Sequence, residues 1–168
     1  MTARSRRRRT PSRWTSREGR FSIRLPKGSR IDVFEDSENF YAVSVECGEW
    51  KGLIQRFRSA PRMLKDAETF ESILDGVLLG LEDAMRPMKV LERRVEGALP
   101  APMRADLVLR GRQSGVDVLQ RRRLIAPGPI PPAAMFLLTA SCAAERFLVH
   151  RRAFEELFDG FRLARPGR

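Results

Sequence analysis

The side chains that could do chemistry in this sequence are few and widely separated. The single histidine, His150, stands beside two arginines, Arg151 and Arg152. No serine lies in a Gly-x-Ser-x-Gly pattern, so a serine nucleophile activated by histidine is not expected. The sequence also lacks the glycine loops that bind phosphates in P-loop and dinucleotide-binding proteins. We therefore expect His150 to be a surface or capping residue.

Carboxylate pairs can perform acid–base chemistry without histidine. The candidates gather in one predicted turn and on the polar faces of two predicted helices: Glu35, Asp36, Glu38, Glu82, Asp83, Glu155 and Glu156. None has the buried polar company that would shift its pKa towards a catalytic value. One histidine and two cysteines cannot supply a zinc site with the usual number of ligands. The sequence thus predicts a protein without a catalytic site, metal or cofactor.

Arginine is concentrated at the N-terminus. Between Met1 and Arg20 stand eight arginines and one glutamate, so this segment carries +7 of the net charge of +11. Its low hydrophobicity and lack of periodicity predict a disordered arm over residues 1–18. An arginine run can neutralise several phosphates and bind nucleic acid without sequence preference. The candidate phosphate-binding residues are Arg4, Arg6, Arg7, Arg8, Arg9, Arg13 and Arg17. The alternative is an arm that only extends or solubilises the chain.

The two cysteines and the longest uncharged run bear on the compartment. Cys47 and Cys142 fall in predicted strands; buried free thiols are favoured, and a disulfide between them is an open alternative. The basic start is not followed by an apolar stretch, so no secretory signal is expected. The run from Ala126 to Ala144 contains four prolines and predicts a loop that leads into one buried strand, without membrane insertion. We expect a cytoplasmic protein.

Alternating apolar residues predict the strands that must position any functional side chain. These strands are expected at residues 20–25, 30–34, 40–46, 50–58, 88–96, 105–112, 116–125 and 133–141. Short turns join the first four, which predicts an antiparallel meander.

Two helices are predicted from apolar residues spaced three and four apart. The first extends from Asp66 to Met85 and contains Gly76 and Gly80, where we expect close approach to a strand. The second is marked by apolar residues over 154–161. Strands, helix, strands and helix in this order indicate an α+β domain over residues 19–164, with an antiparallel sheet flanked by helices.

Five segments resemble, in order, the PsbP/Mog superfamily and, within it, the DcrB-like branch. They are residues 19–26, 66–94, 117–123, 135–140 and 154–163. The similarity covers nearly the whole predicted domain, and its motifs are structural. It implies an antiparallel sheet between helices, as an α/β/α sandwich. It also implies non-enzymatic roles, because relatives include a photosystem subunit, a nuclear-import factor and bacterial chaperones of type VI secretion effectors.

The bacterial chaperones are the relatives that this sequence resembles most. They are cytoplasmic homodimers that shield the apolar N-terminal segments of effectors before export. The resemblance therefore implies a protein-binding adaptor or chaperone with such an effector as its partner. The predicted binding positions lie on the later strands and are Leu107, Leu109, Val118, Gln120, Phe136 and Leu138. For each of these residues, packing in the core is the alternative.

Two other functions stay open at this point. A nucleic-acid-associated protein would use the arginine arm, and a structural subunit would use its surface within a larger assembly. The salt dependence of binding distinguishes a nucleic-acid-associated protein from a chaperone. Phosphate binding by several arginines weakens by orders of magnitude between about 50 and 200 mM salt, whereas apolar capture does not.

Overall fold

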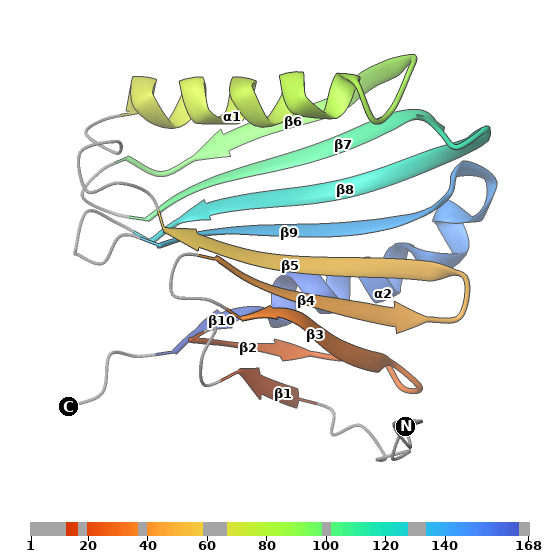
Figure 1. The fold of residues 1–168 in the computed structure, drawn as a ribbon, viewed down its shortest axis with the longest axis horizontal. Coiled ribbons are helices and arrows are strands. Elements are labelled where there is room, and N and C mark those ends of the chain that lie inside the picture. The colour runs from red at the N-terminus through yellow and green to blue at the C-terminus, as the bar shows by residue number, and fades with distance from the viewer. Residues whose placement is uncertain are drawn as a thin grey trace.

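The computed structural model describes residues 13–16, 20–36, 40–58, 67–98, 102–127 and 134–164 (Figure 1). Two α-helices lie in this part of the chain, α1 (Ala67–Glu82) and α2 (Phe147–Gly160), the second preceded by the short 3₁₀ turn η1 (Ala144–Arg146). The strands are β1 (Arg13–Ser16), β2 (Phe21–Arg24), β3 (Arg30–Asp36), β4 (Phe40–Cys47), β5 (Trp50–Arg58), β6 (Met88–Glu96), β7 (Met103–Gln113), β8 (Val116–Ala126), β9 (Ala134–Ala143) and β10 (Arg162–Leu163). Neither α1 nor α2 is long and apolar enough to cross a membrane.

The main sheet is antiparallel throughout and has the strand order β3-β4-β5-β9-β8-β7-β6. It consists of two meanders, β3 to β5 and β6 to β9, which are joined where β5 pairs with β9. α1 connects the inner strand β5 of the first meander to the outer strand β6 of the second. The sheet therefore places segments from both halves of the sequence side by side at its centre (Figure 1).

A second, small sheet consists of β1, β2 and β10. The prediction that residues 20–25 start the meander is wrong, because β2 pairs with β1 and β10 instead. β1 is also a difference from the predicted arm, of which residues 1–12, 17 and 18 lie outside the described residues. Trp14 of β1 packs on Phe21 of β2 with 5.9 Å between the ring centroids. This aromatic contact gives four residues of a polar segment a reason to form a strand.

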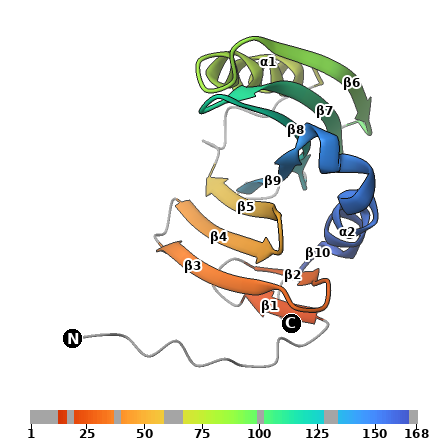
Figure 2. The ribbon, with the colours of Figure 1, turned by 90° about the vertical axis from the view of Figure 1, so that its right-hand side faces the viewer.

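Two cores lie on opposite faces of the main sheet. On one face, α2 and the small sheet bury an aromatic-rich cluster that includes Phe21, Trp50 and Phe154. On the other face, α1 buries an aliphatic cluster around Phe70 and Leu74. Figure 2 shows the resulting layers, with α1 on one side of the curved sheet and α2 on the other. This arrangement confirms the predicted α+β fold with an antiparallel sheet flanked by helices.

The two helices differ in detail from their predictions. α1 ends at Glu82, and Cβ atoms built on Gly76 and Gly80 would meet nothing within 4 Å, so the expected close approach to a strand there is wrong. α2 begins seven residues earlier than its apolar stripe indicates. Leu148 and Val149 are exposed on its first turn, so apolar residues there do not follow the helical spacing that indicates a buried face. His150 consequently lies within α2 and not before it.

The exposed glycines of α1 provide a test of the helix. We expect Gly80→Ala to raise the free energy of unfolding by about 0.5–1 kcal/mol, because alanine is the better helix former and nothing obstructs its methyl group. Gly160→Ala is the matched control, since a Cβ there would collide with Cβ of Arg24. Denaturant melts should show opposite signs for the two variants. Destabilisation by Gly80→Ala would contradict the exposed position of this residue.

Candidate functional site

Each face of the main sheet is covered by described elements over only half of its width. α1 packs over the half that ends at the β6 edge, and α2 with the small sheet packs on the opposite face, over the half that ends at the β3 edge. Two regions of the sheet surface therefore carry no described helix or strand. One lies on the α1 side over β5 and β4 and reaches Ser141 of β9; the other lies on the α2 side over β6 and β7.

The open region on the α1 side is mostly uncharged, and we call it the neutral face. Register places its half-buried side chains on one side of three neighbouring strands: Ser44, Leu53, Gln55, Phe57 and Ser141. Charged residues stand at its margin and are paired, as Lys51 Nζ lies 3.5 Å from Glu46 Oε1. The centre of the face thus offers apolar area and neutral hydrogen-bonding groups without a charge to desolvate.

Arg122 lies on the same side of the sheet, where the neutral face meets α1. Its cross-strand partners are Thr139 of β9 and Leu107 of β7. Burial lowers the pKa of Arg122 to about 10, with no contribution from a neighbouring charge. A folded-state pKa below the unfolded one means that the charged form destabilises the fold, and this cost is fully present at neutral pH.

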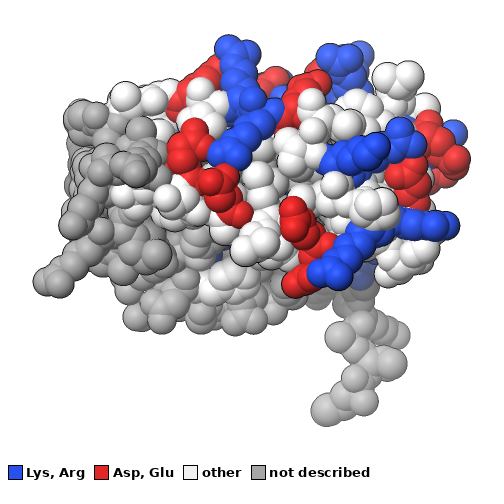
Figure 3. All heavy atoms as spheres, turned by 90° about the horizontal axis from the view of Figure 1, so that it is seen from above, with Lys and Arg blue, Asp and Glu red and all other residues white. Residues whose placement is uncertain are grey.

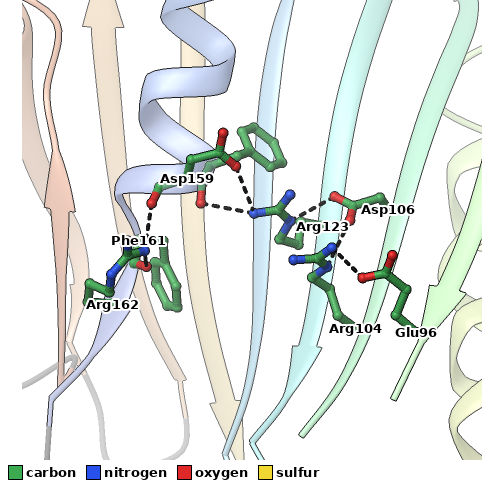
Figure 4. Close-up of polar contacts among 8 residues, drawn as sticks. Glu96, Arg104, Asp106, Arg123, Asp159, Phe161 and Arg162 are labelled. Atoms are coloured by element: carbon green, nitrogen blue, oxygen red, sulfur yellow. Dashed lines mark hydrogen bonds and ion pairs between the residues drawn. The ribbon is translucent and has the colours of Figure 1, made fainter.

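The open region on the α2 side is charged and borders a cleft of ≈ 610 Å³. Arg123 crosses it from β8 and is 6% exposed. Its Nε donates to Asp106 Oδ1 at 2.7 Å, and its Nη1 donates to the carbonyl oxygen of Phe158 at 3.0 Å (Figure 4). Arg104 extends the network from Asp106 to Glu96. Arg123 thereby ties the C-terminal end of α2 to the β7–β8 hairpin.

The titratable side chains around these regions take part in ion pairs. Within the described residues, no group of three His, Cys, Asp or Glu side chains could hold a metal ion. Ion pairing sets the lowered carboxyl pKa values: hydrogen bonds from Arg110 lower the pKa of Asp117, and those from Arg146 lower the pKa of Glu49. His150 Nε2 lies 3.5 Å from the same Glu49 carboxylate. These charges are partners of one another.

The six predicted binding residues do not share one face. Leu107, Leu109 and Gln120 are buried on the α1 side, and Val118 is half-buried there. Phe136 and Leu138 are buried on the α2 side. The reason is register, because Leu107 is opposite Arg122 while Leu138 is opposite Arg123. The residues of the neutral face were missed, since their mixed polar and apolar types carry no signal of periodicity.

The predicted phosphate-binding arm is described only in part. Arg4, Arg6, Arg7, Arg8, Arg9 and Arg17 lie outside the described residues. Arg13 belongs to β1 and donates from Nη1 to Ser22 Oγ at 2.9 Å. It lines a cleft of ≈ 340 Å³ with three other arginines and with Glu155, Glu156 and Asp159. The surface above α1 and β6 likewise intersperses both signs of charge (Figure 3).

The two cysteines are free thiols. Cys47 pairs across β4 and β5 with Trp50, and Cys142 follows Ser141, the β9 partner of Lys51. Two strand spacings, about 9–10 Å, therefore separate them. A disulfide needs Cα atoms within about 7 Å, so this register excludes the bridge.

Arg123 should be required for stability. We expect Arg123→Met to lower the free energy of unfolding by about 3 kcal/mol or more, because Asp106 would lose its buried partner. Arg110→Met removes an exposed pair with Asp117 and should cost less than about 1 kcal/mol. Denaturant melts compare the two. Equal effects would show that the buried network does not hold α2 in place.

The thiols should differ in reactivity. Burial raises the pKa of Cys142 and keeps this side chain from reagents, whereas Cys47 is half-buried. Under native conditions we expect a maleimide to modify Cys47 well before Cys142, as followed by mass spectrometry of the Cys47→Ser and Cys142→Ser variants. Faster labelling of Cys142 would contradict the placement of β9 against α2.

Comparisons with known proteins concern the fold. Neither a known protein family nor a curated protein matches the sequence. Cyanobacterial PsbP (CyanoP) from Synechocystis sp. PCC 6803 is similar with a TM-score of 0.63 and 9% identity, over 90% of this chain and 91% of that chain. The Ran-binding protein Mog1p of Saccharomyces cerevisiae has a TM-score of 0.53 and 7% identity, over 90% and 94%.

A third similar structure is PA94 of Pseudomonas aeruginosa, a protein of unknown function and putative regulator. Its TM-score is 0.53 and its identity 14%, over 92% of this chain and 97% of that chain. Identities this low show a shared fold and do not transfer a function. The main sheet, the position of both helices and these similarities together show that the chain has the PsbP/Mog-like fold.

Proposed function

We propose that this chain is a non-enzymatic adaptor or chaperone that binds an apolar segment of another protein. The observation that carries the proposal is the neutral face, where Leu53 is half-buried with no described helix or strand over it and Phe57 lies at the border with the α1 core. Covering an apolar helix with such side chains lowers the free energy, because it removes apolar surface from water. Leu53, Gln55 and Ser44 provide both the apolar contacts and neutral groups for polar atoms of the segment.

The finer part of the proposal concerns the partner. We propose a type VI secretion effector with apolar N-terminal segments, bound in the cytoplasm by a homodimer of this chain, as the resemblance of the sequence implies. The fold is compatible with a protein partner, since Mog1p is a Ran-binding protein. This support is analogy between folds, and the neutral face supplies the physical argument.

Binding of nucleic acid through the arginine arm is the competing proposal. Four arginines line the cleft beside β1, which continues from the arm, but three carboxylates line the same cleft. The mixture of both signs of charge leaves only a small net charge to attract phosphates. The described residues therefore favour the protein partner, and the arm is tested by its removal.

The experiment is capture of the tagged protein from its own cells, with mass spectrometry and an absorbance ratio for nucleic acid. We expect one protein with apolar N-terminal segments, retained equally at about 50 and 200 mM salt. Leu53→Glu should abolish its recovery, because a charge would enter the neutral face. Leu79→Glu is the matched control: Leu79 is 69% exposed on the outer side of α1 and should not affect recovery.

Other outcomes would overturn the proposal. Recovery of nucleic acid that disappears with deletion of residues 1–12, which leaves β1 in place, and with salt, would assign the function to the arm. Equal recovery of the protein partner by wild type and Leu53→Glu, with both variants folded by circular dichroism, would remove the neutral face as the binding surface.

A further inference from the structure

Arg122 is a charged side chain placed in the sheet, and no carboxylate in the described part of the chain pairs with it. It is half-buried between β7 and β9, and its Nε donates to Gln120 Oε1 at 2.9 Å. Its two Nη atoms bond nothing in the described part of the chain. Arginine carries five N–H donors, so one is used and four are left. A guanidinium held partly out of water without a carboxylate costs free energy that folding does not recover.

None of the described carboxylates on this side of the sheet pairs with Arg122, and four of them are engaged with other cations. Glu71 and Asp75 of α1 both bind Arg93 of β6, the latter at 2.8 Å. Glu46 is paired with Lys51, and on β3 Asp32 Oδ2 lies 3.2 Å from the Nε of Arg30. Among the described arginines on this side, Arg122 is therefore the one without a carboxylate partner. If a carboxylate of a neighbouring ion pair moved to Arg122, another arginine would lose its partner.

Thr139 is a second, independent sign of a missing ligand. It is 6% exposed, and its Oγ1 has no hydrogen-bond partner among the described residues. Register places Thr139 directly opposite Arg122, where side chains of neighbouring strands are about 4.5–5.5 Å apart at Cβ. A buried hydroxyl without a partner is uncommon in folded proteins. One acceptor between the two would satisfy both groups.

The ligand that fits this pair of donors is a carboxylate. Because Gln120 Oε1 accepts the hydrogen bond from Nε of Arg122, the outer edge of the guanidinium with both Nη atoms is available to a ligand. A carboxylate accepts two parallel bonds from such an edge and can accept a further bond from a hydroxyl. Its single negative charge also matches the single positive charge of the site.

We propose that Arg122 and Thr139 form a receptor for one carboxylate group of a partner polypeptide, with Gln120 as the positioning residue. The source follows from the location: Thr139 is also opposite Leu53 of the neutral face, so a segment bound there would bring an acidic side chain within reach. The assignment to a polypeptide rests on the proposed function; the carboxylate site itself does not.

The first test uses acetate as the probe, in NMR titrations of the full chain at constant ionic strength with chloride as the exchanged anion. The reporters are the Gln120 side-chain amide and the Leu53 methyl groups. We expect saturable shifts in wild type and at least tenfold weaker binding in Arg122→Met and in Thr139→Val. Arg121→Met is the matched control, because Arg121 is adjacent in sequence and lies on the opposite face over the Phe158 ring; it should bind acetate like wild type.

The second test separates a receptor from a structural arginine. Since the free protein carries an unpaired guanidinium and hydroxyl, Arg122→Met and Thr139→Val should leave its melting temperature unchanged or raise it. Arg123→Met should lower it. A melting temperature of Arg122→Met lowered as far as that of Arg123→Met would show a structural role and overturn the proposal. Acetate shifts that persist unchanged in Arg122→Met would overturn it as well.

The third test identifies the source of the carboxylate. Two synthetic apolar helical peptides of equal length, one with a central Glu and one with Gln, are titrated into wild type and Arg122→Met. We expect the Glu peptide to bind roughly ten- to hundredfold more tightly to wild type, and the preference to vanish in the variant. Equal binding of both peptides to wild type would overturn the polypeptide source. Binding of acetate but of neither peptide would instead show that the proposed function fails while the carboxylate site stands.

Discussion

Eight residue pairs between β5 and β9, from Lys51 opposite Ser141 to Arg58 opposite Ala134, join the two meanders into one sheet. The chain must leave β5 at the centre of that sheet and re-enter at its far edge as β6, so the connecting helix α1 lies across one face. It must also leave β9 at the centre, and α2 returns over the other face. Both half-covered faces follow from this one central pairing.

The consequences for charge are clearest in β8, where Arg122 and Arg123 are neighbours in sequence and point to opposite faces. Arg123 meets Asp106 and the end of α2 and becomes part of the packing. Arg122 meets Leu107 and Thr139, and Gln120 is its hydrogen-bond partner. Arginine thus stabilises the fold on one face, as Arg123, and is available to a ligand on the other, as Arg122. The reason is that a guanidinium is favourable in a sheet only where a carboxylate or carbonyl oxygen meets it.

The fold by itself is compatible with several functions, and CyanoP and Mog1p illustrate that range. This chain combines on one surface the uncharged side chains around Leu53 and, at the border with α1, an arginine that pairs with no described carboxylate. An apolar segment would be stabilised by the uncharged side chains around Leu53, and one acidic residue of it would be stabilised by Arg122. Affinity and selectivity would then come from different parts of one surface.

The sequence predicts the strands of the main sheet, both helices and the fold class, and it misses β1 and β10. Residues 88–96 were predicted as a strand and form β6 over the same range, because alternation of side chains is a local property of an extended chain. The apolar stripe of α1 was readable for the same reason, as Phe70 and Leu74 repeat at helical spacing and are buried.

Tertiary structure alone decided which partners those elements have. Residues 21–24 have the pattern of a strand, but only packing on Trp14 and α2 places them in the small sheet. Leu107 and Leu138 look equivalent in sequence, and the register of β8 sends them to opposite faces. Gly80 looks like a contact point and is exposed. Strand pairing, register and burial depend on residues far apart in the chain, so they cannot be predicted from a local sequence pattern.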